Sequence, residues 1–235
     1  MKNYLQQKKY VYTLSVILIL IVFILLPSCT QETPEILSVE SRIRFIFNPT
    51  EKSLQQYLSV HLEVENREVA ETVQEVRILA GTSTMSWEIE SGKLQIRDVD
   101  ARTFIGTNAL SQPIGVDFPD GDYIIEIITG QGNRAESLIT LPRPELFAGV
   151  KKYPNKWFPS VTKNEDNSFL FSGGKKYLIR RYDSTGNYID AFYLDNSRVD
   201  VDSDTFSLLK EYNYIEISVF NHIVGAELIT GPVYL

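Results

Sequence analysis

The stretch Leu58-Ser59-Val60-His61-Leu62-Glu63-Val64-Glu65 places an apolar residue at every second position. This period of two is typical of a β-strand with one buried face. Residues 43–47 before it and residues 93–97 after it alternate in the same way. On this pattern His61 lies on the polar face of its strand, where we expect a solvated side chain.

The same alternation continues outward along the chain and predicts hairpins. Residues 122–128 and 134–141 flank Thr129-Gly130-Gln131-Gly132-Asn133, a composition that suits a hairpin loop. Two further hairpins are predicted within residues 177–194 and 214–230. The segment around residues 69–80 fits both a helical and a strand period. We favour a strand over residues 75–79, because the neighbouring segments are strands.

Leu141-Pro142-Arg143-Pro144 interrupts this pattern, because two prolines in three residues cannot serve a central strand. A domain boundary is therefore predicted there. The halves on either side end alike: Asp122-Tyr123-Ile124-Ile125-Glu126-Ile127 and Asn213-Tyr214-Ile215-Glu216-Ile217 are each followed by a turn and another alternating stretch. The repeat supports two domains of the same type.

In this arrangement the chain resembles tandem immunoglobulin-like or fibronectin type III-like domains. Tyr123, which follows Pro119-Asp120-Gly121-Asp122, resembles the tyrosine corner of such domains, and Tyr214 or Tyr212 is the candidate in the second half. The resemblance implies an all-β fold with two tandem antiparallel β-sandwich domains after a cleaved signal peptide. The expected parts are a signal peptide (1–28), a tether (29–35), a first sandwich (36–142), a linker (143–155) and a second sandwich (156–235).

The start of the chain has the form of an export signal. Three lysines and no acidic residue occupy the first ten positions, and residues 16–26 are apolar without a break. An uncleaved membrane anchor is the alternative. A helix over residues 11–26 would measure about 24 Å, which is short of the roughly 30 Å of a hydrocarbon core. The length therefore favours a signal peptide.

Leu26-Pro27-Ser28-Cys29 stands at the end of the apolar run and resembles the lipobox of bacterial lipoproteins, although small or aliphatic residues are commoner than Pro27. The resemblance implies that the Cys29 thiol carries a diacylglyceryl group and that a dedicated peptidase cuts between Ser28 and Cys29. The new amino terminus would usually be acylated too. Thr30 follows the cysteine where some bacteria use aspartate for inner-membrane retention, so the outer membrane is expected if there are two.

Charge and composition limit the partners. Removal of residues 1–28 leaves 20 of the 23 basic residues against 30 acidic ones, a formal charge of −10. Such a surface repels nucleic acid, and no basic stripe is present. Cys29 is the only cysteine, so the exported part has no disulfide. The expected partners are a membrane, through the N-terminal lipid, and envelope proteins or glycans.

The sequence assigns no catalytic, cofactor-binding or metal site. There is no Gly-x-Ser-x-Gly motif, and His61 and His222 are interpreted as surface residues. Asp200, Asp202, Asp204 and Glu211 match loop positions 1, 3, 5 and 12 of a calcium site, but Thr205 replaces the glycine of that loop. Alternation with Val199 and Val201 explains the aspartates without metal.

Three functions remain open. The first is a non-catalytic lipid-anchored module that binds an envelope protein or supports an assembly. The second is a glycan binder, suggested by Tyr153, Trp157 and Phe158, although aromatic residues beside a linker more often seal an interface. The third is an envelope enzyme, which no motif supports. A glycan binder should present a planar row of exposed aromatic residues on one sheet face, whereas a scaffold protein should not. An enzyme should present a cleft with converging polar side chains.

Overall fold

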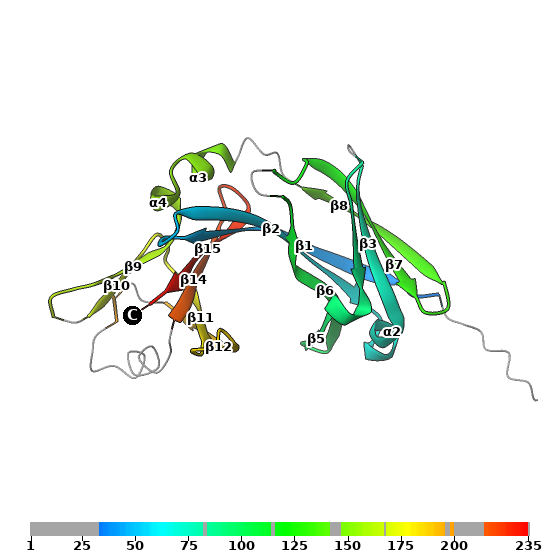
Figure 1. Cartoon of the computed structure of the whole chain (residues 1–235). Helices are drawn as coiled ribbons and strands as arrows, with labels where there is room; N and C mark the ends of the chain where they lie inside the picture. The colour runs from blue at the N-terminus through cyan, green and yellow to red at the C-terminus, as the bar shows by residue number, and fades with distance from the viewer. Residues whose placement is uncertain are drawn as a thin grey trace, which may run out of the picture. The chain divides into compact units, whose positions relative to one another are not determined.

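A computed structural model describes residues 33–81, 84–113, 116–141, 147–166, 168–195, 198–199 and 214–234 (Figure 1). The chain divides into two units, Met1–Thr33 and Pro34–Leu235, and the elements below belong to the second. The predicted signal peptide, Ser28 and Cys29 lie outside the described residues. No helix in the described ranges combines the length and the apolar character that a membrane crossing requires.

The described part of the chain is built almost entirely of strands, which confirms the all-β class. In chain order its elements are β1 (Ile36–Asn48), β2 (Ser53–Val64), α2 (Arg67–Thr72), β3 (Val73–Ala80), β4 (Ser86–Glu90), η1 (Ser91–Lys93), β5 (Gln95–Val99), β6 (Arg102–Ser111), β7 (Gly121–Thr129), β8 (Arg134–Leu141), α3 (Ala148–Lys152), α4 (Pro154–Trp157), β9 (Ser160–Lys163), β10 (Phe169–Ser172), β11 (Tyr177–Tyr182), β12 (Tyr188–Leu194), β13 (Arg198–Val199), β14 (Tyr214–Asn221) and β15 (Ala226–Val233).

These strands form three sheets. The largest has eight strands in the order β12-β11-β14-β15-β1-β2-β6-β5, and the others have the orders β4-β3-β7-β8 and β13-β10-β9. The three predicted hairpins are confirmed as β7–β8, β11–β12 and β14–β15. The ambiguous segment divides in two: Asn66 Oδ1 accepts a hydrogen bond from Val69 N and begins α2, and β3 follows from Val73.

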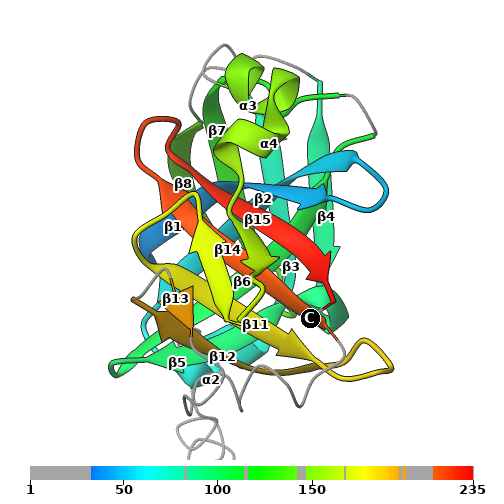
Figure 2. The same cartoon turned by 90° about the vertical axis from the view of Figure 1, so that its left-hand side faces the viewer.

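The eight-stranded sheet takes strands from both sides of the predicted domain boundary (Figures 1 and 2). β1 pairs antiparallel with β2 and parallel with β15, with Ile43 opposite Ala226 and Phe47 opposite Thr230. The parallel pair is a departure from the antiparallel pairing that the sequence suggested. The segment predicted as a linker contains α3 and the beginning of α4. The division at residue 142 stays a prediction.

The core lies on the apolar faces of these sheets. Ile43, Phe45 and Phe47 of β1 are buried. The ring centroids of Phe45 and Phe147 are 5.0 Å apart, and those of Phe47 and Phe158 are 5.4 Å apart. The start of α3 and the end of α4 thus cover the end of the β1–β2 hairpin.

Two tyrosines fix the entry to their strands. Tyr123, at the start of β7, is fully buried and its hydroxyl donates to the Pro119 carbonyl at 2.7 Å. This bond is the tyrosine corner that the sequence predicted. In the second half Tyr177 makes the analogous bond to the Gly174 carbonyl at 2.7 Å. The candidate Tyr214 lies in a different setting, described below, and Tyr212 lies outside the described residues.

Candidate functional site

The eight-stranded sheet has a second face on which polar side chains gather. Residues that pair directly across neighbouring strands point to the same side of a sheet. Arg42 of β1 pairs with Ser59 of β2, and Arg44 of β1 pairs with Glu227 of β15. Because Ile43 and Phe45 face the core, Arg42 and Arg44, which alternate with them along β1, face the opposite side. We call this side the polar face.

Glu227 is the centre of an ion-pair network on the polar face. Its carboxylate lies 2.9 Å from Arg44 Nε and 2.7 Å from Arg180 Nη2, and it accepts a hydrogen bond from the Ser218 hydroxyl. Glu227 is only 6% exposed. Burial alone would raise its pKa, but the charges of Arg44 and Arg180 outweigh burial and lower the pKa to about 2. Glu227 is therefore an ionised structural carboxylate at neutral pH.

His61 of β2 is buried, only 2% exposed, and the expectation of a solvated side chain is wrong. β2 lies between β1 and β6 in the sheet. Arg44 of β1 and Arg97 of β5 line a groove on the polar face together with His61. Burial, with the charges of Arg97 and Arg44, lowers the pKa of His61 to about 4. The imidazole is therefore neutral at pH 7.

The hydrogen bonds of Ser59 decide which nitrogen of His61 carries the proton. The Ser59 hydroxyl donates to Asn108 Oδ1 at 2.7 Å, and the same oxygen lies 3.4 Å from His61 Nδ1. Since its single proton is committed to Asn108, Ser59 acts as the acceptor and Nδ1–H as the donor. His61 is then not placed as a base for the Ser59 hydroxyl, and its Nε2 is left as an acceptor.

Two buried nitrogen atoms of the polar face have no hydrogen-bond partner among the described residues. They are His61 Nε2 and Arg180 Nη1. Both residues line a groove of about 650 Å³ on the polar face. The groove lining also includes Glu40, Arg42, Arg44, Ser59, Arg97, Asn108, Leu178 and Glu227.

A row of tyrosines crosses the polar face at the far end of β11. Tyr182 pairs with Tyr188 of β12 on one side and with Tyr214 of β14 on the other. The rings of Tyr182 and Tyr214 stack with their centroids 4.8 Å apart. The ring centroid of Tyr188 is 6.0 Å from that of Tyr182, and the centroid of Tyr234 is 5.8 Å from that of Tyr214. Tyr188 and Tyr234 are 58% and 62% exposed. The Tyr182 hydroxyl donates to Glu216 at 2.8 Å.

The rings of this tyrosine row do not share one plane. Tyr182 and Tyr214 are within 10° of parallel, whereas Tyr188 is turned by 70° from Tyr182 and Tyr234 by 57° from Tyr214. The row is therefore exposed at its two ends, but it is not the planar row expected of a glycan binder. The sequence analysis named only Tyr214, as a tyrosine-corner candidate, and placed Tyr182 and Tyr188 in a predicted hairpin. Tyr188, Tyr182 and Tyr214 lie opposite one another on paired strands. Their proximity can be recognised only once the strand pairing is known.

The aromatic residues named from the sequence are not brought together as an exposed surface. Phe158 is buried against Phe47, and Trp157 is partly buried beside Gly149. Only Tyr153 is substantially exposed, at 47%. The stretch thus packs on the core next to β1 and does not form an exposed aromatic surface.

His222 and the possible calcium ligands are the remaining candidates from the sequence. His222 lies in the turn after β14, exposed, with its ring 4.8 Å from that of Phe220. The possible calcium ligands Asp200, Asp202, Asp204 and Glu211 lie outside the described residues. Within the described ranges no three His, Cys, Asp or Glu side chains are grouped closely enough to hold a metal ion.

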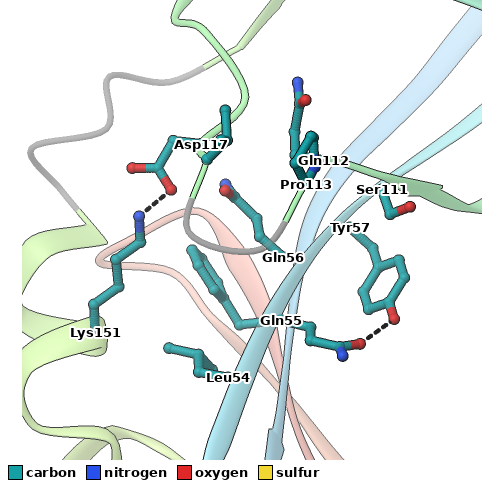
Figure 3. A pocket seen from close by; sticks show the side chains of 11 residues that line it. Leu54, Gln55, Gln56, Tyr57, Ser111, Gln112, Pro113, Asp117 and Lys151 are labelled. Carbon is teal, nitrogen blue, oxygen red and sulfur yellow. Dashed lines mark hydrogen bonds and ion pairs between the residues drawn. The ribbon is translucent and has the colours of Figure 1, made fainter.

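A second pocket, of about 460 Å³, lies away from the polar groove beside the β1–β2 hairpin (Figure 3). Lys151 of α3 and Asp117 form an ion pair at its edge. The side-chain amide of Gln56 extends into the pocket and has no hydrogen-bond partner among the described residues. Lys151 is the one cation that lines this pocket, whereas four arginines line the groove on the polar face.

Comparisons with known proteins give only distant likenesses. No protein-family model matches the chain, and no curated protein matches it. Among solved structures, the chain is similar to dimeric latent PorU from Porphyromonas gingivalis, with 10% identity and a TM-score of 0.31. The match covers 85% of this chain but only 20% of PorU.

Two other solved structures match with lower TM-scores. They are Dpr11 IG1 bound to DIP-gamma IG+IG2 (10% identity, TM-score 0.24, covering 84% of this chain and 98% of that one) and the periplasmic chaperone SfaE (10% identity, TM-score 0.18, covering 82% and 98%). At these scores none of the three likenesses bears on function.

Proposed function

We propose that this chain is a lipid-anchored, non-catalytic binding module of the cell envelope and that its ligand is a glycan held on the polar face. The observation that carries the proposal is the row formed by Tyr188, Tyr182 and Tyr214 on three paired strands, with Tyr234 beside it just after β15. Anchoring rests on the lipobox-like sequence that ends at Cys29.

The tyrosine row has the chemical character that sugar recognition needs. Exposed faces of tyrosine rings offer rigid apolar area, and their hydroxyls offer hydrogen bonds. Tyr188 and Tyr234 are the exposed members of the row, and the stacked pair of Tyr182 and Tyr214 lies between them. Glu216 accepts from the Tyr182 hydroxyl and has a second oxygen that suits a sugar hydroxyl.

The catalytic alternative has weaker support on the polar face. Glu227 is held ionised between two arginines, and the Ser59 proton is directed to Asn108 rather than to His61. A general acid would need a raised pKa, and a nucleophile would need a base within reach. The converging side chains of the groove therefore fit binding better than bond cleavage.

The test is glycan binding by the full-length chain in detergent, measured on a panel of immobilised polysaccharides and then in solution by calorimetry. We expect Tyr188→Ala and Tyr234→Ala each to weaken binding about 2- to 12-fold, the range for one aromatic contact. Tyr153→Ala, an exposed tyrosine outside the row, is the control and should bind normally. Absence of binding to the whole panel, or equal losses in all three variants, would leave a protein-binding or structural role instead.

A further inference from the structure

The groove next to the tyrosine row is a built polar site whose hydrogen bonds are incomplete. Buried polar groups in folded proteins are nearly always paired, so each unpaired one requires an explanation. His61 Nε2 and Arg180 Nη1 are both buried, both unpartnered among the described residues and both in the lining of one groove. A bound molecule that satisfies the two atoms is the simplest explanation.

The charge of the groove specifies the first part of that molecule. Arg42, Arg44, Arg97 and Arg180 line it against two carboxylates, Glu40 and Glu227, which leaves an excess of two positive charges. The whole chain has a formal charge of −7. A positive groove in an acidic protein attracts anions locally. Guanidinium groups favour carboxylate and phosphate oxygens, which match their planar donor geometry.

Arg180 is the arginine best placed to bind such an anion. Its Nη2 already donates to Glu227, which holds the guanidinium in position. Its Nη1 is left as a buried donor. Arg97 lies at the exposed rim, paired with Glu40 at 3.0 Å and set over the Phe104 ring at 5.2 Å. One donor is therefore deep in the groove and a second cation lies at its mouth.

His61 specifies the second part of the molecule. The neutral imidazole presents Nε2 as an acceptor, because Nδ1–H is directed to Ser59. An acceptor calls for a donor, such as a hydroxyl group of the ligand. Gly106 pairs with His61 across β2 and β6, so no side chain from that position competes for the space. The groove volume of about 650 Å³ also lies within the range of small-molecule sites.

We infer that the groove binds a small hydroxylated oxyanion, in which a carboxylate or phosphate group meets Arg180 Nη1 and a hydroxyl group donates to His61 Nε2. Sugar acids, hydroxy acids and protonated phosphate carry both features. The inference does not rest on the tyrosine row, which lies beyond Arg180 along β11 and has no residue in the groove lining.

Histidine resonances give a direct test, because the chain has only two histidines. The full-length chain, labelled at histidine and dissolved in detergent, is titrated with glucuronate, with inorganic phosphate and with glucose. We expect saturable shifts of the His61 imidazole signals with glucuronate, phosphate or both, and none with glucose. The His222 signals should not move. The tighter of the two probes identifies the oxyanion.

Matched variants locate the binding. Arg180→Gln should weaken the tighter probe about tenfold or more, as expected for a hydrogen bond to a charged group. Because Arg180 also holds Glu227, Arg97→Gln at the rim is the second variant and should weaken binding less. Lys151→Gln, which removes a cation from the other pocket, should not change it. Unmoved His61 signals at tens of millimolar of both anions, or equal losses with Lys151→Gln, would overturn the inference.

Discussion

At the scale of single residues, alternation places side chains on the correct face of a strand but does not say what covers that face. Leu58, Val60 and Leu62 are buried as the pattern predicts. Ser59 and His61 lie on the other face, also as predicted, yet both are buried. The polarity of histidine predicts exposure to solvent. The burial of His61 depends instead on arginines from other strands, which no local pattern reveals.

Gly106 is a second residue whose surroundings come from another strand and are not visible in the local sequence. Its contacts allow a prediction. A Cβ atom at this position would lie 2.0 Å from the Val60 carbonyl oxygen and 2.7 Å from His61 Cα. Both obstacles are backbone atoms of the adjacent strand, so they cannot rotate away. We therefore expect Gly106→Ala to lower the free energy of unfolding by about 1–3 kcal/mol or more, the cost of overpacking a core.

Urea unfolding of Gly106→Ala beside Gly92→Ala checks this prediction. A Cβ atom at Gly92 meets no other atom within 4 Å, so that variant should stay within about 0.5 kcal/mol of the wild-type protein. If both variants unfold at the wild-type urea concentration, β2 and β6 are not as closely packed at this point as the structure indicates.

At the scale of elements, strands and hairpins were predictable and their partners were not. Turn composition located β7–β8, β11–β12 and β14–β15, because each hairpin is a local structure. The parallel pair of β1 and β15 joins residues more than 180 positions apart, with Arg44 opposite Glu227. No turn encodes that pairing. Arg44 and Glu227 are charged residues flanked by buried neighbours. In retrospect, this indicates that each needed an oppositely charged partner on another strand.

Glu227 connects these elements and should make the fold sensitive to acid. It binds Arg44 of β1, Arg180 of β11 and Ser218 of β14, and its pKa is lowered from 4.5 to about 2. A carboxylate with a lowered folded-state pKa stabilises the fold above its unfolded pKa. That stabilisation is lost as pH falls from about 5 to about 2, and it amounts to about 3 kcal/mol.

Glu227→Gln tests this contribution. At pH 7 the variant should be less stable by about 3 kcal/mol, because two arginines lose their partner. The difference from wild type should shrink as pH approaches 2, where wild-type Glu227 also loses its charge. His61 acts at higher pH: its pKa of about 4 makes stability fall between about pH 6.5 and 4 in both proteins. Chemical unfolding at several pH values measures the difference, with Glu136→Gln on the exposed part of β8 as the control. A difference that is constant with pH would contradict the assignment.

At the scale of the whole molecule, the sequence predicts two sandwiches, and the described residues place strands of both halves in one sheet. The polar face exists because of this shared sheet. Arg44 and His61 come from the first half, whereas Arg180 and Glu227 come from the second. Motif searches along either half alone could not assemble the groove, because its residues are brought together only by the pairing of β1 with β15.

The last prediction concerns how this unit is held at a membrane. If Cys29 is the lipid acceptor, Cys29→Ala should abolish incorporation of a labelled fatty acid and leave an unprocessed precursor. Each buried methylene contributes about 0.8 kcal/mol, and two or more acyl chains are needed for stable anchoring. The surface charge of −10 after cleavage gives no attraction to anionic headgroups that would replace the lipid.

Thr30→Ala is the matched control for Cys29→Ala, since it changes the adjacent residue and keeps the thiol. It should be labelled, cleaved and recovered with membranes as the wild-type protein is. Both proteins, extracted in detergent, should still show the same His61 response to glucuronate or phosphate, because the groove residues lie on β1, β2, β5, β6, β11 and β15, all C-terminal to the tether. Anchoring and ligand binding are then separable: normal acylation and cleavage of Cys29→Ala would refute the lipid site, and the groove would be judged by its own titration.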